Sequence, residues 1–189
     1  MRAFIAIELP INIKNTISKI QDKLKNNLAP LSWVKPQNLH LTLKFLGGIS
    51  PEQCGAIDRI ITEIAQTTAS FKIKLDDLGV FPNLHNPRIL WIGTNQDLYV
   101  QQLAALLETK TSEMSISKET RNFSTHITIA RIKSRIVPAD LEKEFKKIKN
   151  DIIFTDLEFT TQGLTLFESI LDPQGPTYAV LKEANFRTT

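Results

Sequence analysis

Apolar residues recur along this chain in two periods, one typical of strands and one typical of helices. The segment Arg2–Glu8 alternates in the manner of a strand. After Pro10, apolar residues recur at steps of four, three and four, which predicts a helix with one buried stripe that ends at Asn26-Asn27. That stripe consists of Ile13, Ile17, Ile20 and Leu24.

The same periods divide the rest of the chain. Helices are predicted over Pro51–Ala65, Gln96–Met114 and Pro138–Lys149, the first of them with Ser50 at its N-cap. Strands are predicted over Leu39–Leu46 (closed by a turn at Gly47-Gly48), Phe71–Leu75, Arg88–Gly93, Thr125–Ile132, Ile152–Phe159, Gly163–Phe167 and Thr177–Leu181. Because no low-complexity segment marks a linker, residues 1–189 are predicted to form a single domain.

The order of the predicted elements occurs twice. The tetrapeptides His40-Leu41-Thr42-Leu43 and His126-Ile127-Thr128-Ile129 lie 86 residues apart, and a proline-initiated helix follows each. Each is also preceded by a strand and a long helix, with Arg88–Gly93 serving in both copies. The pattern predicts an α+β fold of two pseudo-symmetric lobes, each an antiparallel sheet with flanking helices and with the active-site cleft between them.

Each tetrapeptide places a histidine and a threonine side by side. Residues i and i+2 of a strand point to the same face, so His40 and Thr42 face away from the core, as do His126 and Thr128. Two such copies at equivalent places indicate one cleft lined by two imidazoles and two hydroxyls.

This set of side chains suits phosphoryl chemistry. Imidazole acts as acid or base near neutral pH, and threonine hydroxyls donate hydrogen bonds to phosphate oxygens. A catalytic zinc site usually takes three protein ligands, and neither histidine face offers a carboxylate or thiolate, so no metal or other cofactor is expected. The remaining alternative is that both histidines are solvated or core residues. The third histidine, His85, lies in a Pro/Asn loop and is interpreted as a surface residue.

Composition narrows the class of protein only slightly. Hydrophobic residues make up 42% and the net charge is +3, which is typical of a globular protein and permits an anionic partner. The single cysteine, Cys54, excludes an internal disulfide, and the first residues are too short an apolar run for a signal peptide. No stretch approaches the length that spans a bilayer. We expect a monomeric cytoplasmic protein without membrane contact.

Read with their surroundings, the tetrapeptides resemble the two-histidine (2H) phosphoesterase superfamily, and within it the RNA 2′,3′-cyclic phosphodiesterases, also called 2′-5′ RNA ligases. The resemblance runs nearly from end to end. It rests on Arg2–Ile7, Trp33-Val34, Asn38–Gly47, Arg88–Gly93, His126–Arg131 and Gly175–Tyr178.

The resemblance implies a metal-independent enzyme that hydrolyses a terminal 2′,3′-cyclic phosphate on RNA or a nucleotide to a 2′-phosphate, with possible reversible 2′-5′ joining. It implies that His40 donates a proton to the 3′ oxygen and that His126 activates water. Thr42 and Thr128 correspond to phosphate-binding threonines, and Arg131 could pair with phosphate.

Some features leave alternatives open. The family usually has proline before the second histidine, where this chain has Ser124-Thr125, which leaves the strand entry less rigid. Phe45, Phe81 and Trp91 could stack on a base but are interpreted as core residues. A related 2H enzyme acting on another cyclic or 2′-5′ nucleotide, or a non-catalytic RNA-binding module, would show the same motifs.

Overall fold

The computed structural model describes residues 1–28, 31–95, 98–120, 122–133, 136–152, 157–173 and 175–188. Its helices are α1 (Ile11–Lys25), α2 (Pro51–Thr67), α3 (Leu98–Ser112) and α4 (Pro138–Asp151), with one 3₁₀ turn, η1 (Pro36–Asn38). Its strands are β1 (Arg2–Glu8), β2 (Ser32–Trp33), β3 (His40–Gly48), β4 (Lys72–Phe81), β5 (Ile89–Thr94), β6 (His126–Arg131), β7 (Glu158–Thr160), β8 (Gly163–Ile170) and β9 (Thr177–Asn185).

The strands form two antiparallel sheets of matching design. The first has the order β3-β1-β8-β9 and the second β2-β6-β5-β4-β7, so each histidine strand lies beside the first strand of its own repeat. The repeats exchange strands, because β8 and β9 come from the second half of the chain but join the first sheet, and β2 and β4 come from the first half but join the second. The predicted α+β fold with two similar lobes is confirmed.

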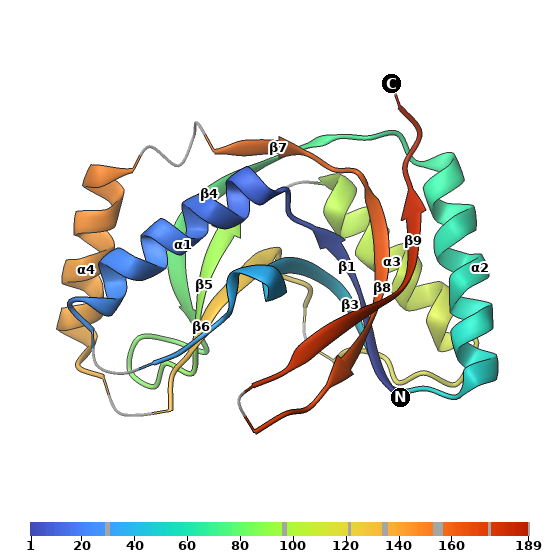
Figure 1. The fold of residues 1–189 in the computed structure, drawn as a ribbon, viewed down its shortest axis with the longest axis horizontal. Helices are drawn as coiled ribbons and strands as arrows, with labels where there is room; N and C mark the ends of the chain where they lie inside the picture. Colours follow the sequence, from blue (N-terminus) through green and yellow to red (C-terminus); the bar gives the residue numbers. More distant parts are fainter. Residues whose placement is uncertain are drawn as a thin grey trace.

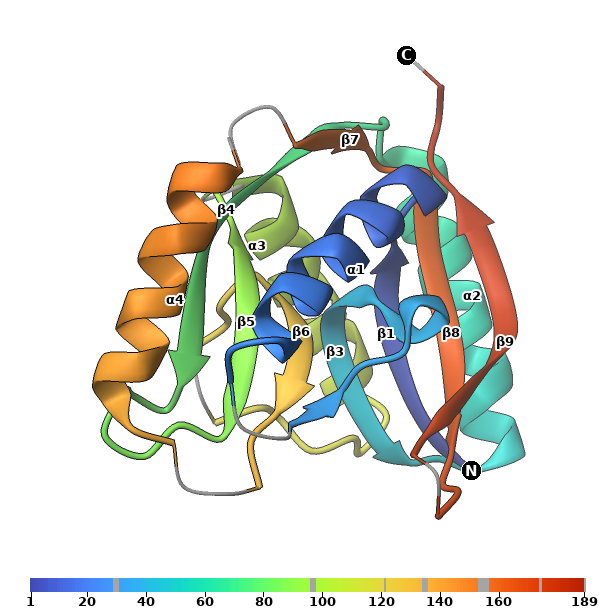
Figure 2. The ribbon, with the colours of Figure 1, turned by 60° about the vertical axis from the view of Figure 1, so that its left-hand side comes forward.

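The helices cover the sheets in pairs. Helix α2 packs on β8 and β9 and α3 packs on β3, whereas α1 contacts α4. In both Figure 1 and Figure 2, α4 and α2 lie at opposite ends of the molecule with the two sheets between them. One cluster of buried apolar side chains includes residues of both sheets and of every helix, so the lobes share a core. Within the described ranges, no helix is long and apolar enough to cross a membrane.

Several predicted boundaries differ from the structure. β3 does not turn at Gly47-Gly48 but continues through both, with Gly47 at φ +70°. β4 does not end at Leu75, because a register irregularity between Leu75 and Leu78 absorbs two aspartates and the strand continues to Phe81. The start of the predicted helix Gln96–Met114 and residues 153–156 of the predicted strand Ile152–Phe159 lie outside the described residues.

Candidate active site

The two histidine strands carry the same irregularity at the same place. In β3, Leu43 has no partner on β1, and in β6, Ile129 has no partner on β5. Such a bulge shifts the alternation of the side chains by one residue. Phe45 and Arg131 therefore lie on the same face as the histidine–threonine pairs and are both exposed.

Backbone carbonyl groups fix both imidazoles in one tautomer. His40 Nδ1 lies 2.7 Å from the carbonyl oxygen of Asn38, and His126 Nδ1 lies 2.7 Å from that of Ser124. Because a carbonyl oxygen only accepts, each Nδ1 carries a proton and donates it. Each neutral ring then presents the lone pair of Nε2. His126 keeps this arrangement without the proline that the family usually has before it.

His40 lies in an aromatic enclosure formed by the first lobe. Its ring stacks on Phe4 at 4.7 Å between centroids, and the edge of Tyr178 approaches at 5.3 Å. His40 Nε2 lies 2.9 Å from the hydroxyl oxygen of Thr42. Burial lowers the pKa of His40 from 6.5 to about 4, although the hydrogen bond to Asn38 opposes the shift.

His126 has a similar but more open environment in the second lobe. Phe81 contacts its ring edge-on at 5.0 Å, and Trp91 lies at 6.4 Å. A Cβ at Gly79 would lie 2.2 Å from the Trp91 ring, so glycine makes room for this indole. Burial lowers the pKa of His126, and the hydrogen bond to the Ser124 carbonyl opposes that shift.

Each pair contributes one side chain to a cavity of about 1130 Å³, which Thr42 lines from β3 and His126 lines from β6. A positive charge on His126 lowers the pKa of His40, so the two imidazoles interact across the lobes. Burial raises the pKa of Tyr178 in the first lobe, and the positive charge of Arg131 in the second lobe opposes that rise. Residues predicted from both repeats thus surround one space.

The aromatic residues were wrongly assigned to the core. Phe45 is 61% exposed, and Phe81 and Trp91 are half-buried against His126. Thr128 lies half-buried on the cleft face, and His85 is exposed in its loop, as predicted. Among the described residues, no three His, Cys, Asp or Glu side chains gather closely enough to hold a metal ion.

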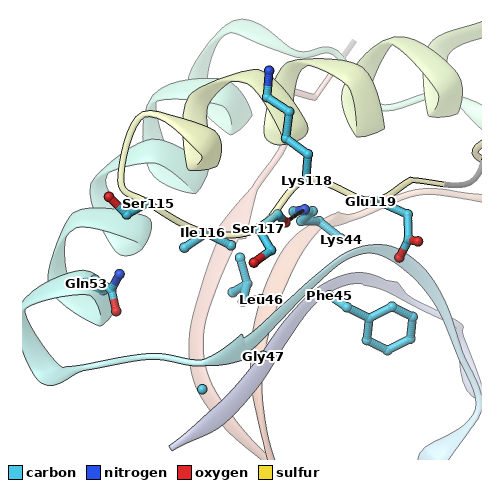
Figure 3. A pocket seen from close by; sticks show the side chains of 11 residues that line it. Lys44, Phe45, Leu46, Gly47, Gln53, Ser115, Ile116, Ser117, Lys118 and Glu119 are labelled. Carbon is cyan, nitrogen blue, oxygen red and sulfur yellow. Dashed lines mark hydrogen bonds between the residues drawn. The ribbon is translucent and has the colours of Figure 1, made fainter.

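A second hollow of about 320 Å³ adjoins the cavity and shares Lys44, Phe45 and Glu119 with it. Figure 3 shows Phe45 and Glu119 at one end of this hollow and Gln53 and Ser115 at the other. No histidine lines this hollow, whereas His126 lines the larger cavity.

The chemistry available at this cavity is proton transfer beside an anion. Two Nε2 atoms of half-buried imidazoles are groups that can act as acid and base, two hydroxyls offer hydrogen bonds, and Arg131 offers positive charge. An anion placed between the rings would raise the pKa of both, because it stabilises their charged forms.

Comparison with known proteins agrees with this geometry. The family model described as "LigT like Phosphoesterase" matches the chain twice, over residues 7–91 and 92–178, which corresponds to the predicted repeat. The RNA 2′,3′-cyclic phosphodiesterase of Methanocaldococcus jannaschii is 36% identical over 97% of this chain and 99% of its own length. That of Thermotoga maritima is 31% identical over 98% and 96%.

Solved structures give the same result. The crystal structure of TT0787 of Thermus thermophilus covers 100% of this chain and 99% of its own, with a TM-score of 0.83 and 28% identity. E. coli LigT complexed with 3′-AMP covers 98% and 97%, with a TM-score of 0.75 and 27% identity. This chain therefore belongs to the LigT-like phosphoesterase family.

Proposed function

We propose that this protein is an RNA 2′,3′-cyclic phosphodiesterase that hydrolyses a terminal 2′,3′-cyclic phosphate to a 2′-phosphate by acid–base catalysis without metal. The observation that carries the proposal is that each His–Thr pair contributes to a single cavity, which Thr42 lines from β3 beside His40 and which His126 lines from β6. The full-length relatives that bear this activity in their names support the same substrate class.

In the proposed reaction, His126 acts as the base and His40 as the acid. The free Nε2 of His126 takes a proton from water as the water oxygen attacks phosphorus. The bond from phosphorus to the 3′ oxygen breaks, and Nε2–H of His40 donates its proton to that oxygen. The hydroxyls of Thr42 and Thr128 donate hydrogen bonds to the non-bridging oxygens, and Arg131 offsets the charge that grows there.

The low pKa of His40 fits this role only when substrate is bound. In the free protein, burial lowers that pKa to about 4, so the ring is mostly neutral at pH 7. The cyclic phosphate is an anion, and an anion beside a buried imidazole raises its pKa. Substrate binding thus protonates His40 at the site where the proton is needed.

Alanine variants test the two imidazoles. His40→Ala and His126→Ala should each lower kcat on a nucleoside 2′,3′-cyclic phosphate by about 10²–10⁴-fold, because each removes one proton-transfer group. His85→Ala, in the exposed loop, is the matched control and should keep the wild-type rate. Circular dichroism shows whether each variant is folded. A folded variant of either catalytic histidine with wild-type turnover would contradict the proposal.

Chelation and product analysis test the rest of the reaction. Turnover should persist in EDTA, and the product should be a 2′-phosphate rather than a 3′-phosphate. Loss of activity in EDTA would indicate a metal-dependent hydrolase. Tight binding of 2′-phosphorylated nucleotides by the wild-type protein without turnover would indicate a binding module.

We also propose that residues 1–189 act as one two-lobed domain, as a monomer in the cytoplasm, on RNA ends or nucleotides with a 2′,3′-cyclic phosphate. The support is that one chain supplies groups from both repeats to the cavity, Thr42 from the first and His126 from the second. Size-exclusion chromatography with light scattering should give a mass near 21.4 kDa.

A further inference from the structure

Asn38 is a buried polar residue that lies two positions before His40. It is 8% exposed and is the last residue of the 3₁₀ turn η1. Its N–H donates to the Lys35 carbonyl oxygen at 2.9 Å, which closes the turn, and its own carbonyl oxygen accepts from Nδ1 of His40 at 2.7 Å. Its side-chain amide donates to the carbonyl oxygen of Pro176 at 2.7 Å. Asn38 thus joins the His40 ring to a segment 138 residues away in the chain.

The hydrogen bond from the Asn38 side chain reaches across one face of the first sheet. β3 and β9 are the outer strands of this sheet, with β1 and β8 between them. Neighbouring strands lie about 4.8 Å apart, so strands three places apart lie about 14 Å apart in a flat sheet. Asn38 precedes β3 and Pro176 precedes β9, yet their side-chain nitrogen and carbonyl oxygen are 2.7 Å apart. The chain before β3 and the chain before β9 therefore approach each other over the face of the sheet.

This approach brings Tyr178 of β9 against His40. Tyr178 follows Pro176 by two residues, and its ring lies 5.3 Å from that of His40 and 4.9 Å from that of Phe4, edge-on in both contacts. Phe4 stacks on the same imidazole from β1. The two rings enclose His40, and burial is the main cause that lowers its pKa to about 4. The Asn38 amide holds the end of β9 that carries one side of this enclosure.

The matching residue of the second repeat shows what the Asn38 side chain adds. Ser124 lies two residues before His126, and its carbonyl oxygen accepts from Nδ1 of that ring, as the carbonyl oxygen of Asn38 does for His40. Ser124 is exposed, however, whereas Asn38 is buried. The carbonyl contact is common to both histidines, and the buried amide is a feature of the first repeat.

Resting on the proposed function, we propose that Asn38 is a positioning residue for the proposed acid: its carbonyl oxygen orients the His40 ring, and its side-chain amide holds the β8–β9 hairpin against that ring. Asn38 acts through His40 and Tyr178 and not on the substrate. Misplacement of a reacting group by about 1 Å can cost about 10²-fold in rate, so this support is expected to affect turnover.

Substitution of Asn38 tests the kinetic effect. Asn38→Ala keeps the carbonyl oxygen and removes the amide, so kcat on a nucleoside 2′,3′-cyclic phosphate should fall by about 10- to 100-fold with KM near the wild-type value. Asn38→Asp has the same size but replaces the donor by a carboxylate that only accepts, so it should lower kcat at least as much. Circular dichroism shows whether each variant is folded.

A matched control is available at the end of α1. The side-chain amide of Asn27 donates to the carbonyl oxygen of Lys23 at 3.1 Å in an exposed position. Asn27→Ala therefore removes a hydrogen bond of the same kind without changing the surroundings of His40. Its kcat and KM should equal those of the wild type.

The pKa of His40 is a second readout, and a structural role of Asn38 away from the ring would not change it. The titratable and charged groups that face the ring are Glu8 of β1, Lys14 of α1, His126 of β6 and Tyr178 of β9. Asn38→Ala changes none of them but lets water reach the imidazole, so the pKa of His40 should rise from about 4 toward 6.5. NMR titration of the free protein measures this pKa, and the His40 signal is the one that His40→Ala lacks.

Tyr178→Ala shows whether Asn38 acts through the hairpin. This variant should itself raise the pKa of His40, and adding Asn38→Ala to it should cause no further rise, because the hairpin then has no ring to hold in place. Additive rises in the two variants would overturn the inference. So would a folded Asn38→Ala variant with wild-type kcat, or one with lowered kcat and an unchanged pKa of His40.

These outcomes are separate from those that test the proposed function. Wild-type turnover of the cyclic phosphate, and its loss in His40→Ala, depend on the imidazoles whatever Asn38 does. The phosphodiesterase proposal can therefore hold while the inference about Asn38 fails. The pKa of His40 is measured without substrate, so it tests the hairpin contact even if the proposed substrate is wrong.

Discussion

The buried imidazole of His40 links the protein's stability to pH. Burial lowers the pKa of His40 from 6.5 in the unfolded chain to about 4 in the folded one, so the unfolded state binds more protons between these values. Stability is therefore full above pH 6.5 and falls as the pH drops toward 4. This group accounts for at most about 3 kcal/mol of that fall.

Urea unfolding of His40→Gln tests this linkage. The variant lacks the titrating group, so the wild-type free energy of unfolding should fall relative to the variant's by up to about 3 kcal/mol between pH 7 and pH 4. His85→Gln controls for the loss of one imidazole from the exposed loop. Parallel stability curves for wild type and His40→Gln would contradict the assignment.

At the scale of single residues, the sequence indicated the candidate histidines and threonines but not all of the residues beside them. Strict alternation puts Lys44 on the face of His40 and Thr42 and puts Phe45 in the core. The bulge reverses this, so Lys44 is buried with its ammonium group 2.8 Å from Glu108, and Phe45 is exposed. A bulge arises from pairing with a neighbouring strand, which alternation along one strand does not reveal.

Each bulged strand is supported by a polar side chain from a helix of the other sequence repeat. Glu108 of α3 binds Lys44 of β3, and Gln21 of α1 donates to the carbonyl oxygens of Val34 and Ile129 at 2.9 and 2.8 Å. Gln21 is only 1% exposed. The bulge of β6 leaves Ile129 without a partner on β5, and its carbonyl oxygen accepts from the Val34 N–H and from this buried amide instead.

We expect Gln21→Leu to destabilise the fold by about 1–3 kcal/mol, because it removes the hydrogen bonds that the amide donates to the carbonyl oxygens of Val34 and Ile129. Chemical denaturation measures this change. Thr16→Ala on the same helix removes an exposed hydrogen bond to Asn12 and should change stability by about 0.5 kcal/mol or less. If the two variants lose similar stability, Gln21 does not support the bulge.

Helices and strands were predicted correctly where one hydrophobic period ran without interruption. The predictions failed where pairing with a neighbouring strand determined the end of the element. The helix at Pro51 was predicted from Ser50 at the N-cap and Pro51 at the first helical position, and in the structure Ser50 and Gln53 also form a capping box. The second half of β4 was missed because Asp76-Asp77 interrupts the alternation, although pairing with β5 continues beyond it.

Exchange of strands between the repeats is a property of the whole molecule. The repeated order of elements was visible in the sequence, because it needs only the periods and the two His–Thr tetrapeptides. The exchange of strands was not visible in the sequence, because a strand has the same hydrophobic pattern whichever of the two sheets it joins. As a result, each sheet contains strands from both halves of the chain, and the apolar core is shared.

The exchange predicts that neither half folds alone. A fragment of residues 1–86 keeps only β3 and β1 of the first sheet and only β2 and β4 of the second, where these two are not neighbours. A two-stranded sheet is at best marginal in water, and the shared core would be exposed. Thermal unfolding of fragment 1–86, or of 87–189, should show no cooperative transition by circular dichroism.

Mixing the two fragments should restore a cooperative transition together with hydrolysis of the cyclic phosphate, because both histidines are needed. Cooperative unfolding of either fragment alone would mean that its lobe is stable without the exchanged strand.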